Sequence, residues 1–248
     1  MRKLMTTGIC KSYDGISIIE DINITAYENE MVCLLGSSGI GKTTLFNILS
    51  GIEKPDKGEV FLDTRDITGK AGNVSYMQQK DLLLPYKTTL DNVALPLVIK
   101  GSTKNDARKE AQKYFDDFML TGNEKKYPDQ LSGGMRQRAA LLRTYLFSQE
   151  VMLLDEPFSK LDTITKSHIH NWYLKVRKRL KSTTLFITHD IDEAILLSDR
   201  IYILSGKPAT LTKEMTISTK EARDEGFTTS EAFIRYKKEI LAHIHIAN

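Results

Sequence analysis

The sequence predicts an α/β protein built on a parallel sheet, and three apolar segments support this prediction. MVCLLG at residues 31–36, VMLLDEP at 151–157 and TTLFITHD at 183–190 each contain a short, nearly continuous apolar run. Such runs are typical of strands that are buried on both faces. A helix is predicted between the second and third strands, so the connection is a crossover and these strands should lie parallel.

The N-terminal residues predict a different kind of β structure. Residues 1–30 alternate loosely between apolar and polar and contain turn signals at Asp14-Gly15 and Glu28-Asn29. This pattern predicts an antiparallel β layer. TLFNILSGI at residues 44–52 has helical spacing and ends at a glycine, so a helix should follow the first buried strand directly.

Two further regions are predicted to be helical. Residues 88–150 contain the segments 107–120 and 135–147, and their position between two core strands predicts an inserted helical subdomain. Residues 162–181 repeat apolar side chains at three- and four-residue steps and predict one long helix. Its apolar positions are Ile164, Ile169, Trp172, Val176 and Leu180, with His168 in the same register.

The tail beyond about residue 215 is predicted to end in a helix, so we divide the chain into a domain at 1–215 and a short helical extension at 216–248. Thr228 with Glu231 would form a capping box at the start of that helix. Apolar residues from Phe233 to Ile244 give the helix one apolar stripe. The extension is either a regulatory element or a packing helix.

The composition is that of an ordinary soluble globular protein, with 41% hydrophobic and 27% charged residues among 248. The formal net charge is only +3, and the basic run at 175–181 fits a solvated helix face, so no nucleic-acid partner is expected. Cys10 and Cys33 suggest neither a disulfide framework nor a metal site. No apolar segment is long enough to span a bilayer, so a protein acting at a membrane would be held there by another subunit.

GSSGIGKT at residues 36–43 has the spacing of a phosphate-binding loop, G-x-x-x-x-G-K-[ST]. Glycines let the backbone wrap phosphates with its N–H groups pointing inward. Lys42 would reach the β and γ phosphates, and the Thr43 hydroxyl could bind Mg²⁺. A strand is predicted before the motif and a helix after it, which is the context that this chemistry requires.

The strand at 151–155 supplies the acidic partners of this loop. Asp155 and Glu156 stand at its carboxyl end, where open α/β sheets bind their ligands. Asp155 would hold the metal and Glu156 would activate a water molecule. Acidic residues at strand ends are often merely solvated, and it is the preceding phosphate loop that favours the functional interpretation.

Three other candidates are ambiguous when taken singly. His189 follows a strand and could be structural, Gln79 could be a metal contact or a loop amide, and Tyr13 could stack on an adenine or simply pack. LSGGMRQR at 131–138 exposes backbone before a predicted helix, which is a second arrangement suited to an anion.

Together these residues resemble the ABC-type ATPase family, and the resemblance extends from about residue 2 to about 215. Its most specific mark is LSGG, which precedes the strand at 151–155. The resemblance implies an ABC ATPase fold, with ATP and Mg²⁺ as cofactors and ATP hydrolysis as the activity. It implies that Tyr13 stacks on adenine, that Glu156 is the catalytic base, and that His189 contacts the γ-phosphate beside Lys42. The other implied ATP contacts are Gly36, Ser37, Ser38, Gly39, Ile40, Gly41, Thr43, Thr44 and Gln79, and the implied metal contacts are Thr43, Gln79 and Asp155.

The resemblance also implies a homodimer. LSGG caps a helix of the inserted subdomain and cannot serve its own chain's ATP, so Ser132, Gly133 and Gly134 should contact the γ-phosphate held by a second copy. Asp162 in SKLD would lie in the loop that crosses to the partner. Two loops per chain then predict two shared ATP sites per dimer.

More narrowly, LSGGMRQR and the segments 82–93 and 188–205 are similar to the importer ATPases for nitrate, sulfonate, taurine and related small solutes. Sister subfamilies for bicarbonate or thiamine-precursor pyrimidines have similar subunits. This likeness implies a peripheral subunit on the cytoplasmic side of the membrane, bound to permease subunits and indirectly to a solute-binding protein. The alternatives are an exporter ATPase and a soluble switch acting on nucleic acid or ribosomes.

Three sequence features leave alternatives open. Gln78 precedes Gln79, and the spacing to Pro85 favours Gln79 as the family's glutamine. Lys160 puts a charge where the family commonly has a small residue, either solvated or in contact with the partner. The leucines of residues 82–97 either face the permease or pack the helical subdomain.

Overall fold

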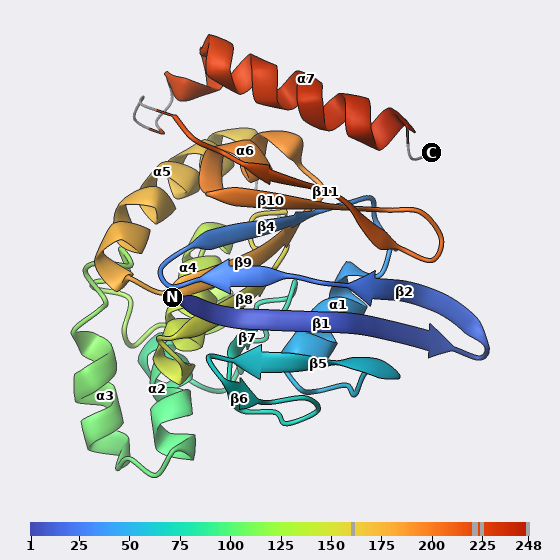
Figure 1. The fold of residues 1–248 in the computed structure, drawn as a ribbon. Coiled ribbons are helices and arrows are strands. Elements are labelled where there is room, and N and C mark those ends of the chain that lie inside the picture. Colours follow the sequence, from blue (N-terminus) through green and yellow to red (C-terminus); the bar gives the residue numbers. More distant parts are fainter. Residues whose placement is uncertain (160–161, 220–222, 224–225, 247–248) are drawn as a thin grey trace.

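The computed structural model describes residues 1–159, 162–219, 223 and 226–246, which form two sheets with helices packed on and between them (Figure 1). The larger sheet has six strands, and five of them run parallel while β11 pairs antiparallel with β10 at one edge. In spatial order the strands are β11 (Thr210–Thr216), β10 (Arg200–Ser205), β4 (Met31–Leu35), β9 (Thr183–Thr188), β8 (Val151–Asp155) and β7 (Ser75–Met77).

The three buried strands predicted from the sequence are confirmed as β4, β8 and β9, side by side at the centre of this sheet. All five residues of β4 are buried, and they alternate between two hydrophobic clusters. Met31 and Cys33 pack on the side of most of the helices, whereas Val32 and Leu34 pack on the side of the second sheet. A strand that has core on both faces needs apolar residues at every position, which explains the continuous runs.

The predicted antiparallel layer is confirmed and is larger than the first thirty residues. β1 (Arg2–Tyr13) pairs with β2 (Ile16–Ile22), β3 (Thr25–Tyr27) and β5 (Lys57–Leu62), and β6 (Arg65–Asp66) extends the edge. The helix predicted at residues 44–52 is α1 (Lys42–Leu49), and its apolar residues share a core with both sheets. α1 is therefore fixed between the two layers.

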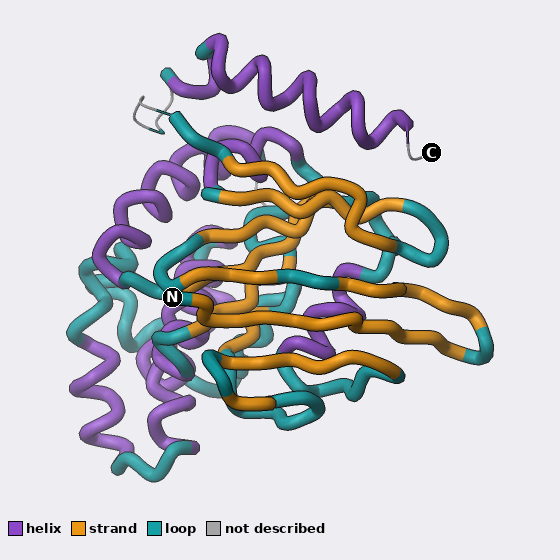
Figure 2. The backbone as a smooth tube through the Cα atoms, viewed as in Figure 1, coloured by secondary structure: helices purple, strands orange, loops and turns teal. Residues whose placement is uncertain are grey.

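The chain between β7 and β8 forms α2 (Thr89–Ile99), α3 (Lys104–Gln112), the 3₁₀ turn η1 (Pro128–Gln130) and α4 (Gly133–Phe147). Figure 2 shows α2 and α3 as helices without any strand beside them at that end of the molecule. The prediction of helix over 107–120 is wrong beyond Gln112. Residues 113–119 form successive turns in which several amides bond to the carbonyl three residues earlier, and Phe115, Phe118 and Leu120 are buried.

The long helix predicted at 162–181 is α5 (Thr163–Leu180), and α6 (Ile191–Leu197) follows β9. The side chain of Ile164 and the whole of Lys160 lie outside the described residues, so the interpretations placed on them stay predictions. Asp162 caps α5 with its carboxylate, and Asp190 caps α6 in the same way.

The C-terminal helix is α7 (Glu231–Ile246), and its predicted capping residue is wrong. Residues Phe227–Thr229 form the 3₁₀ turn η2, so the helix begins later and Ser230 caps it, with the Phe233 amide 3.2 Å from its hydroxyl. Phe233, Tyr236 and Ile240 are buried in the cluster that also contains α6 residues. The division of the chain at residue 215 stays a prediction; β11 itself runs to Thr216. Among the described residues, no helix is both long and apolar enough to cross a bilayer.

Candidate functional site

The phosphate-binding loop lies between the end of β4 and the start of α1, and its shape depends on glycine. Gly39 and Gly41 have φ values of 77° and 107°, in the left-handed region that favours glycine. A Cβ added to Gly41 would lie 2.8 Å from the side chain of Ile19 in β2. The antiparallel layer therefore lies directly against the loop. α1 begins immediately after the loop, and the free amides of its first turn are available to a ligand.

Lys42 is folded back onto this loop. Its Nζ donates to the backbone oxygens of Gly36 at 2.8 Å and Ser37 at 2.7 Å, and the residue is 95% buried. Burial lowers the pKa of Lys42, while the carboxylates of Glu156 and Asp155 oppose the shift. The amine thus stands at the centre of the loop, held by two carbonyl oxygens.

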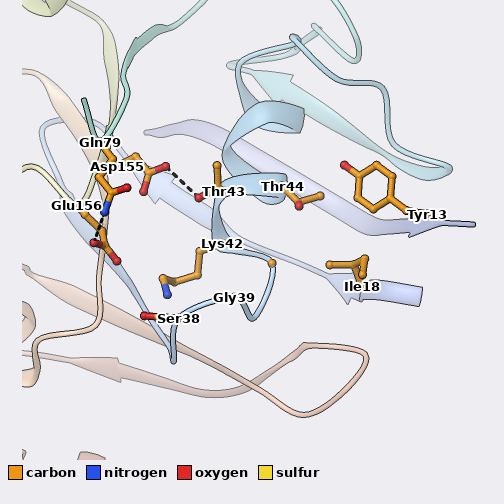
Figure 3. Close-up of a pocket in the computed structure, with 11 residues that line it drawn as sticks. Tyr13, Ile18, Ser38, Gly39, Lys42, Thr43, Thr44, Gln79, Asp155 and Glu156 are labelled. Atoms are coloured by element: carbon orange, nitrogen blue, oxygen red, sulfur yellow. Dashed lines mark hydrogen bonds between the residues drawn. The ribbon is translucent and has the colours of Figure 1, made fainter. Parts of the chain in front are cut away.

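A cavity of about 430 Å³ opens in front of the loop (Figure 3). At one end lie the two acidic residues at the end of β8, and at the other lie Tyr13 and Ile18 from β1 and β2. Most predicted nucleotide contacts line it, whereas Gly36, Ser37, Ile40 and His189 do not. The lining comprises Tyr13, Ile18, Ser38, Gly39, Gly41, Lys42, Thr43, Thr44, Gln79, Asp155 and Glu156.

The metal candidates meet at the base of this cavity. The Thr43 hydroxyl donates to Asp155 Oδ2 at 3.0 Å, and Gln79 lines the same wall. Burial raises the pKa of Asp155, which the hydrogen bond from Thr43 opposes. A hydroxyl, a carboxylate and an amide oxygen suit Mg²⁺. No group of three or more His, Cys, Asp or Glu side chains among the described residues is arranged to hold a metal ion.

Glu156, Gln79 and His189 come together although they are far apart in the sequence. Gln79 Nε2 donates to Glu156 Oε2 at 2.9 Å, and His189 Nδ1 lies 3.0 Å from Glu156 Oε1. Glu156 has a φ of 45°, which is uncommon for a residue with a side chain and turns its carboxylate towards both partners. Gln78 is exposed and does not line the cavity, so the geometry favours Gln79 as the functional glutamine.

At the other end of the cavity, the Tyr13 ring is 42% exposed. Its hydroxyl is hydrogen-bonded to Glu53, and Lys11 Nζ lies 5.4 Å from the ring centroid. The ring is thus held at the rim of the cavity with a free face, an arrangement that can stack on a planar base.

Three residues at this site escaped prediction. Ile18 lines the cavity and Glu53 holds Tyr13, but an isoleucine in a strand and a glutamate after a helix give no signal of their own. The Tyr76 hydroxyl lies 3.4 Å from Asp155 Oδ2, and burial raises the pKa of Tyr76. The sequence around Tyr76 gives no signal of this contact, which arises because β7 pairs with β8.

The LSGG segment does not line the cavity of its own chain. The Ser132 hydroxyl accepts the Met135 amide at 3.3 Å as the cap of α4. A Cβ added to Gly133 would meet nothing within 4 Å, so this backbone faces open space, whereas Gly134 packs against Ile169 of α5. Asp162 likewise lines no part of the cavity, and its carboxylate caps α5.

A second hollow, also of about 430 Å³, lies between α1 and the helical insert. It is largely apolar, with Ile52 and Tyr76 on one side and Leu82, Leu84 and Ile99 on the other. The sequence leaves two roles open for the leucines of residues 82–84, facing the permease or packing the helical subdomain, and two of these leucines differ in exposure. Leu82 is half exposed at the hollow, whereas Leu83 is buried in the core.

Comparison with known proteins agrees with this site. Residues 19–159 match the family model described as ABC transporter. The chain is 47% identical over 191 residues to the formylaminopyrimidine import ATP-binding protein ThiZ of Halalkalibacterium halodurans, covering 77% of this chain and 74% of that protein. It is 37% identical over 226 residues to the aliphatic sulfonates import ATP-binding protein SsuB of Bacillus cereus, covering 91% and 88%.

A solved structure is similar as well. The ATP-binding cassette MJ0796, a dimer in a post-hydrolysis state bound to ADP and phosphate, superposes with a TM-score of 0.74 at 28% identity. The match covers 87% of this chain and 99% of that one.

Proposed function

The chain belongs to the ABC transporter family and is an ATP-binding ATPase, and from this premise we propose that it energises the import of a small solute through a separate permease. The observation that supports the ATPase chemistry most directly is the convergence of Gln79 and His189 on Glu156, beside the phosphate-binding loop. Convergent polar groups at a phosphate site are what hydrolysis needs.

In the proposed reaction, water attacks the γ-phosphorus of ATP in line with the bond to the β-phosphate oxygen. The new P–O bond forms as that bond breaks, and ADP leaves with the bridging oxygen. Glu156 accepts the proton of the water, and His189 orients the carboxylate and contacts the γ-phosphate. Lys42 donates to phosphate oxygens and stabilises their negative charge.

Mg²⁺, held by Thr43, Asp155 and Gln79 together with the phosphates, would neutralise part of the charge on the transferring group. The short contact between Thr43 and Asp155 supports this assignment, because both oxygens already point to one place.

We propose that the second chain of a homodimer completes each site. Gly133 presents open backbone at a helix N-terminus and Ser132 lies beside it, so both are accessible to a phosphate held by another copy. Asp162 would lie in the connection to that copy. The dimeric state of the similar MJ0796 cassette supports the arrangement.

The apolar hollow between α1 and the helical insert would receive the permease. Leu82 and Ile99 are 50% and 71% exposed there, and apolar residues gathered on an exposed face are typical of an interaction site. In this arrangement the chain is peripheral, at the cytoplasmic face of the membrane. A solute-binding protein would deliver the solute to the opposite face of the permease.

The solute is proposed only by class. Two relatives are named for the import of formylaminopyrimidine and of aliphatic sulfonates, and these are small polar molecules of different chemistry. The permease and the binding protein select among such solutes, because nothing in this chain contacts them.

Uptake by the reconstituted complex tests this function. The chain would be combined in vesicles with the permease and the binding protein encoded beside it, and ATP-dependent accumulation of nitrate, taurine, an alkanesulfonate and formylaminopyrimidine would be measured. We expect Ile99→Glu to lower uptake about tenfold relative to the chain's own ATP hydrolysis, because a charge would enter an apolar interface. Ile234→Glu on α7 is the matched control and should leave uptake unchanged. ATP-independent uptake, or equal effects of both variants, would refute the proposal.

A further inference from the structure

A cluster of charged and polar groups, in which His170 and Glu193 are buried, lies next to His189. It joins α5, the end of β9 and the start of α6. Lys166 Nζ lies 2.6 Å from Asp190 Oδ2 and 2.7 Å from Glu193 Oε1. One helical turn further along α5, His170 Nε2 lies 3.3 Å from Glu193 Oε1 without the alignment of a hydrogen bond.

Glu193 and Thr188 are buried in this cluster, whereas Lys166 and Asp190 are partly exposed. Glu193 is only 3% exposed, and its burial would raise its pKa, but contacts from His170, Lys166 and Thr188 lower the pKa overall. Burial would likewise lower the pKa of Lys166, but the hydrogen bonds to Asp190 and Glu193 raise it. Buried ion pairs contribute little to stability compared with apolar packing, so stability alone is a weak reason for such a cluster.

The cluster contacts the residues immediately before and after His189, the histidine next to Glu156. Before His189, the Thr188 hydroxyl donates to Glu193 Oε2 at 2.6 Å. After it, the Asp190 carboxylate receives Lys166 at 2.6 Å. The Asp190 amide also donates to the Thr188 hydroxyl at 3.0 Å, so both neighbours of the histidine are tied to the cluster and to each other.

The cluster also reaches towards the predicted dimer seam. Lys166 lies four residues, or one helical turn, after Asp162, the cap of α5. Lys166 therefore connects the first turn of α5 with the residues next to His189 through ion pairs at 2.6 and 2.7 Å.

We propose that the ion pairs of Lys166 with Asp190 and Glu193 are positioning contacts for ATP hydrolysis. They hold the backbone on both sides of His189. They also link the position of His189 next to the proposed base, Glu156, to the first turn of α5. This inference rests on the proposed roles of His189 and Glu156.

The test is a split between turnover and affinity in the full-length chain. We expect Lys166→Met to lower kcat for ATP hydrolysis about tenfold, since misplacing a reacting group by less than 1 Å costs this much. The Kd for ATP should stay within about twofold, because the phosphate-binding loop keeps its own contacts. Lys166→Arg, which can make both ion pairs, should recover most of the rate. The matched control is Lys175→Met, an exposed lysine on the same helix, which should match the wild type.

A milder variant covers the case in which Lys166→Met does not fold. Asn is an N-cap as good as Asp, so Asp190→Asn preserves the start of α6 while removing one ion pair. We expect a smaller loss of kcat, about threefold, because the pair with Glu193 persists. In the double variant, Asp190→Asn should add almost nothing to Lys166→Met.

Full kcat in both Lys166→Met and Asp190→Asn would overturn the inference. So would equal losses of kcat and ATP affinity, which would indicate a general structural role. The proposed function is tested separately by the wild type and Glu156→Gln. If Glu156→Gln hydrolyses ATP normally, the proposed catalytic site is wrong. If it is inactive while Lys166→Met is fully active, only the positioning role is wrong.

Discussion

The chain contains two glycine-containing loops suited to phosphate, and they differ in whether they face their own chain. The loop at residues 36–44 is enclosed: β2 presses on Gly41, and Lys42 fills its centre. The segment at 131–138 is open: Ser132 caps α4, and Gly133 meets nothing. The first loop lines a cavity with its neighbours in the fold, while the second exposes backbone groups and does not line that cavity.

The difference shows that similar local chemistry can serve different molecules. A closed loop is complete once its chain folds, because its neighbours and its own lysine shape it. An open helix N-terminus offers dipole and amides but becomes a site only when a ligand is brought to it from outside. The enclosed loop is thus shaped within one chain, and the open segment is where a second chain would act in the proposed dimer.

The largest expected effect concerns the enclosed loop. Glu156→Gln removes the proposed base but keeps a side chain that can still bond to Gln79 and His189. We expect ATP hydrolysis to fall about a thousandfold with ATP affinity nearly unchanged, since general-base catalysis is worth this much. Fluorescent-nucleotide titration and phosphate release measure the two quantities. The variant should also accumulate as a dimer with ATP in size-exclusion chromatography, and a rate near wild type would contradict the role of Glu156.

A large effect on ATP hydrolysis is expected at the open loop, and the rate in mixed dimers shows whether that loop acts in its own chain or in the partner. Ser132→Arg places a long charged side chain where a second copy's phosphate should bind and should lower hydrolysis about a hundredfold. Lys42→Ala should be inactive as well. A mixture of the two chains should recover roughly half of the wild-type rate in its mixed dimers, because one site then pairs an intact Lys42 with an intact Ser132. If no activity returns on mixing, the open loop acts within its own chain.

The smallest effect is expected at the rim of the cavity. Tyr13→Ala removes the exposed ring and should weaken ATP binding about tenfold, which is typical of losing one base–aromatic stack. The kcat at saturating ATP should not change, because the ring is far from the phosphate end. Tyr13→Phe keeps the ring and should bind nearly as the wild type does; loss of affinity in Tyr13→Phe would instead assign the effect to the hydroxyl and Glu53.

The sequence was sufficient where one residue pattern has one structural solution. Continuous apolar runs predicted β4, β8 and β9, and the glycine spacing predicted the loop that Lys42 occupies. It failed where tertiary packing chose between local solutions. Turns at 113–119 replace the predicted second half of a helix, and η2 moves the cap of α7 from Thr228 to Ser230.

The same distinction, between local pattern and tertiary packing, applies to the residues of the site. Motif residues could be predicted because their chemistry requires their spacing. Ile18, Tyr76 and Lys166 could not, because their roles arise from strand pairing and helix packing between segments distant in the chain. Gln79 could be chosen over Gln78 by spacing, and the hydrogen bond to Glu156 favours the same choice.

The contacts of Lys42 shape the loop without any ligand. The amine has three donors, and two of them bond to the carbonyls of Gly36 and Ser37. These bonds hold the loop in one conformation, which lowers the entropy that ligand binding must overcome. The lysine thus acts as an internal brace of its own loop.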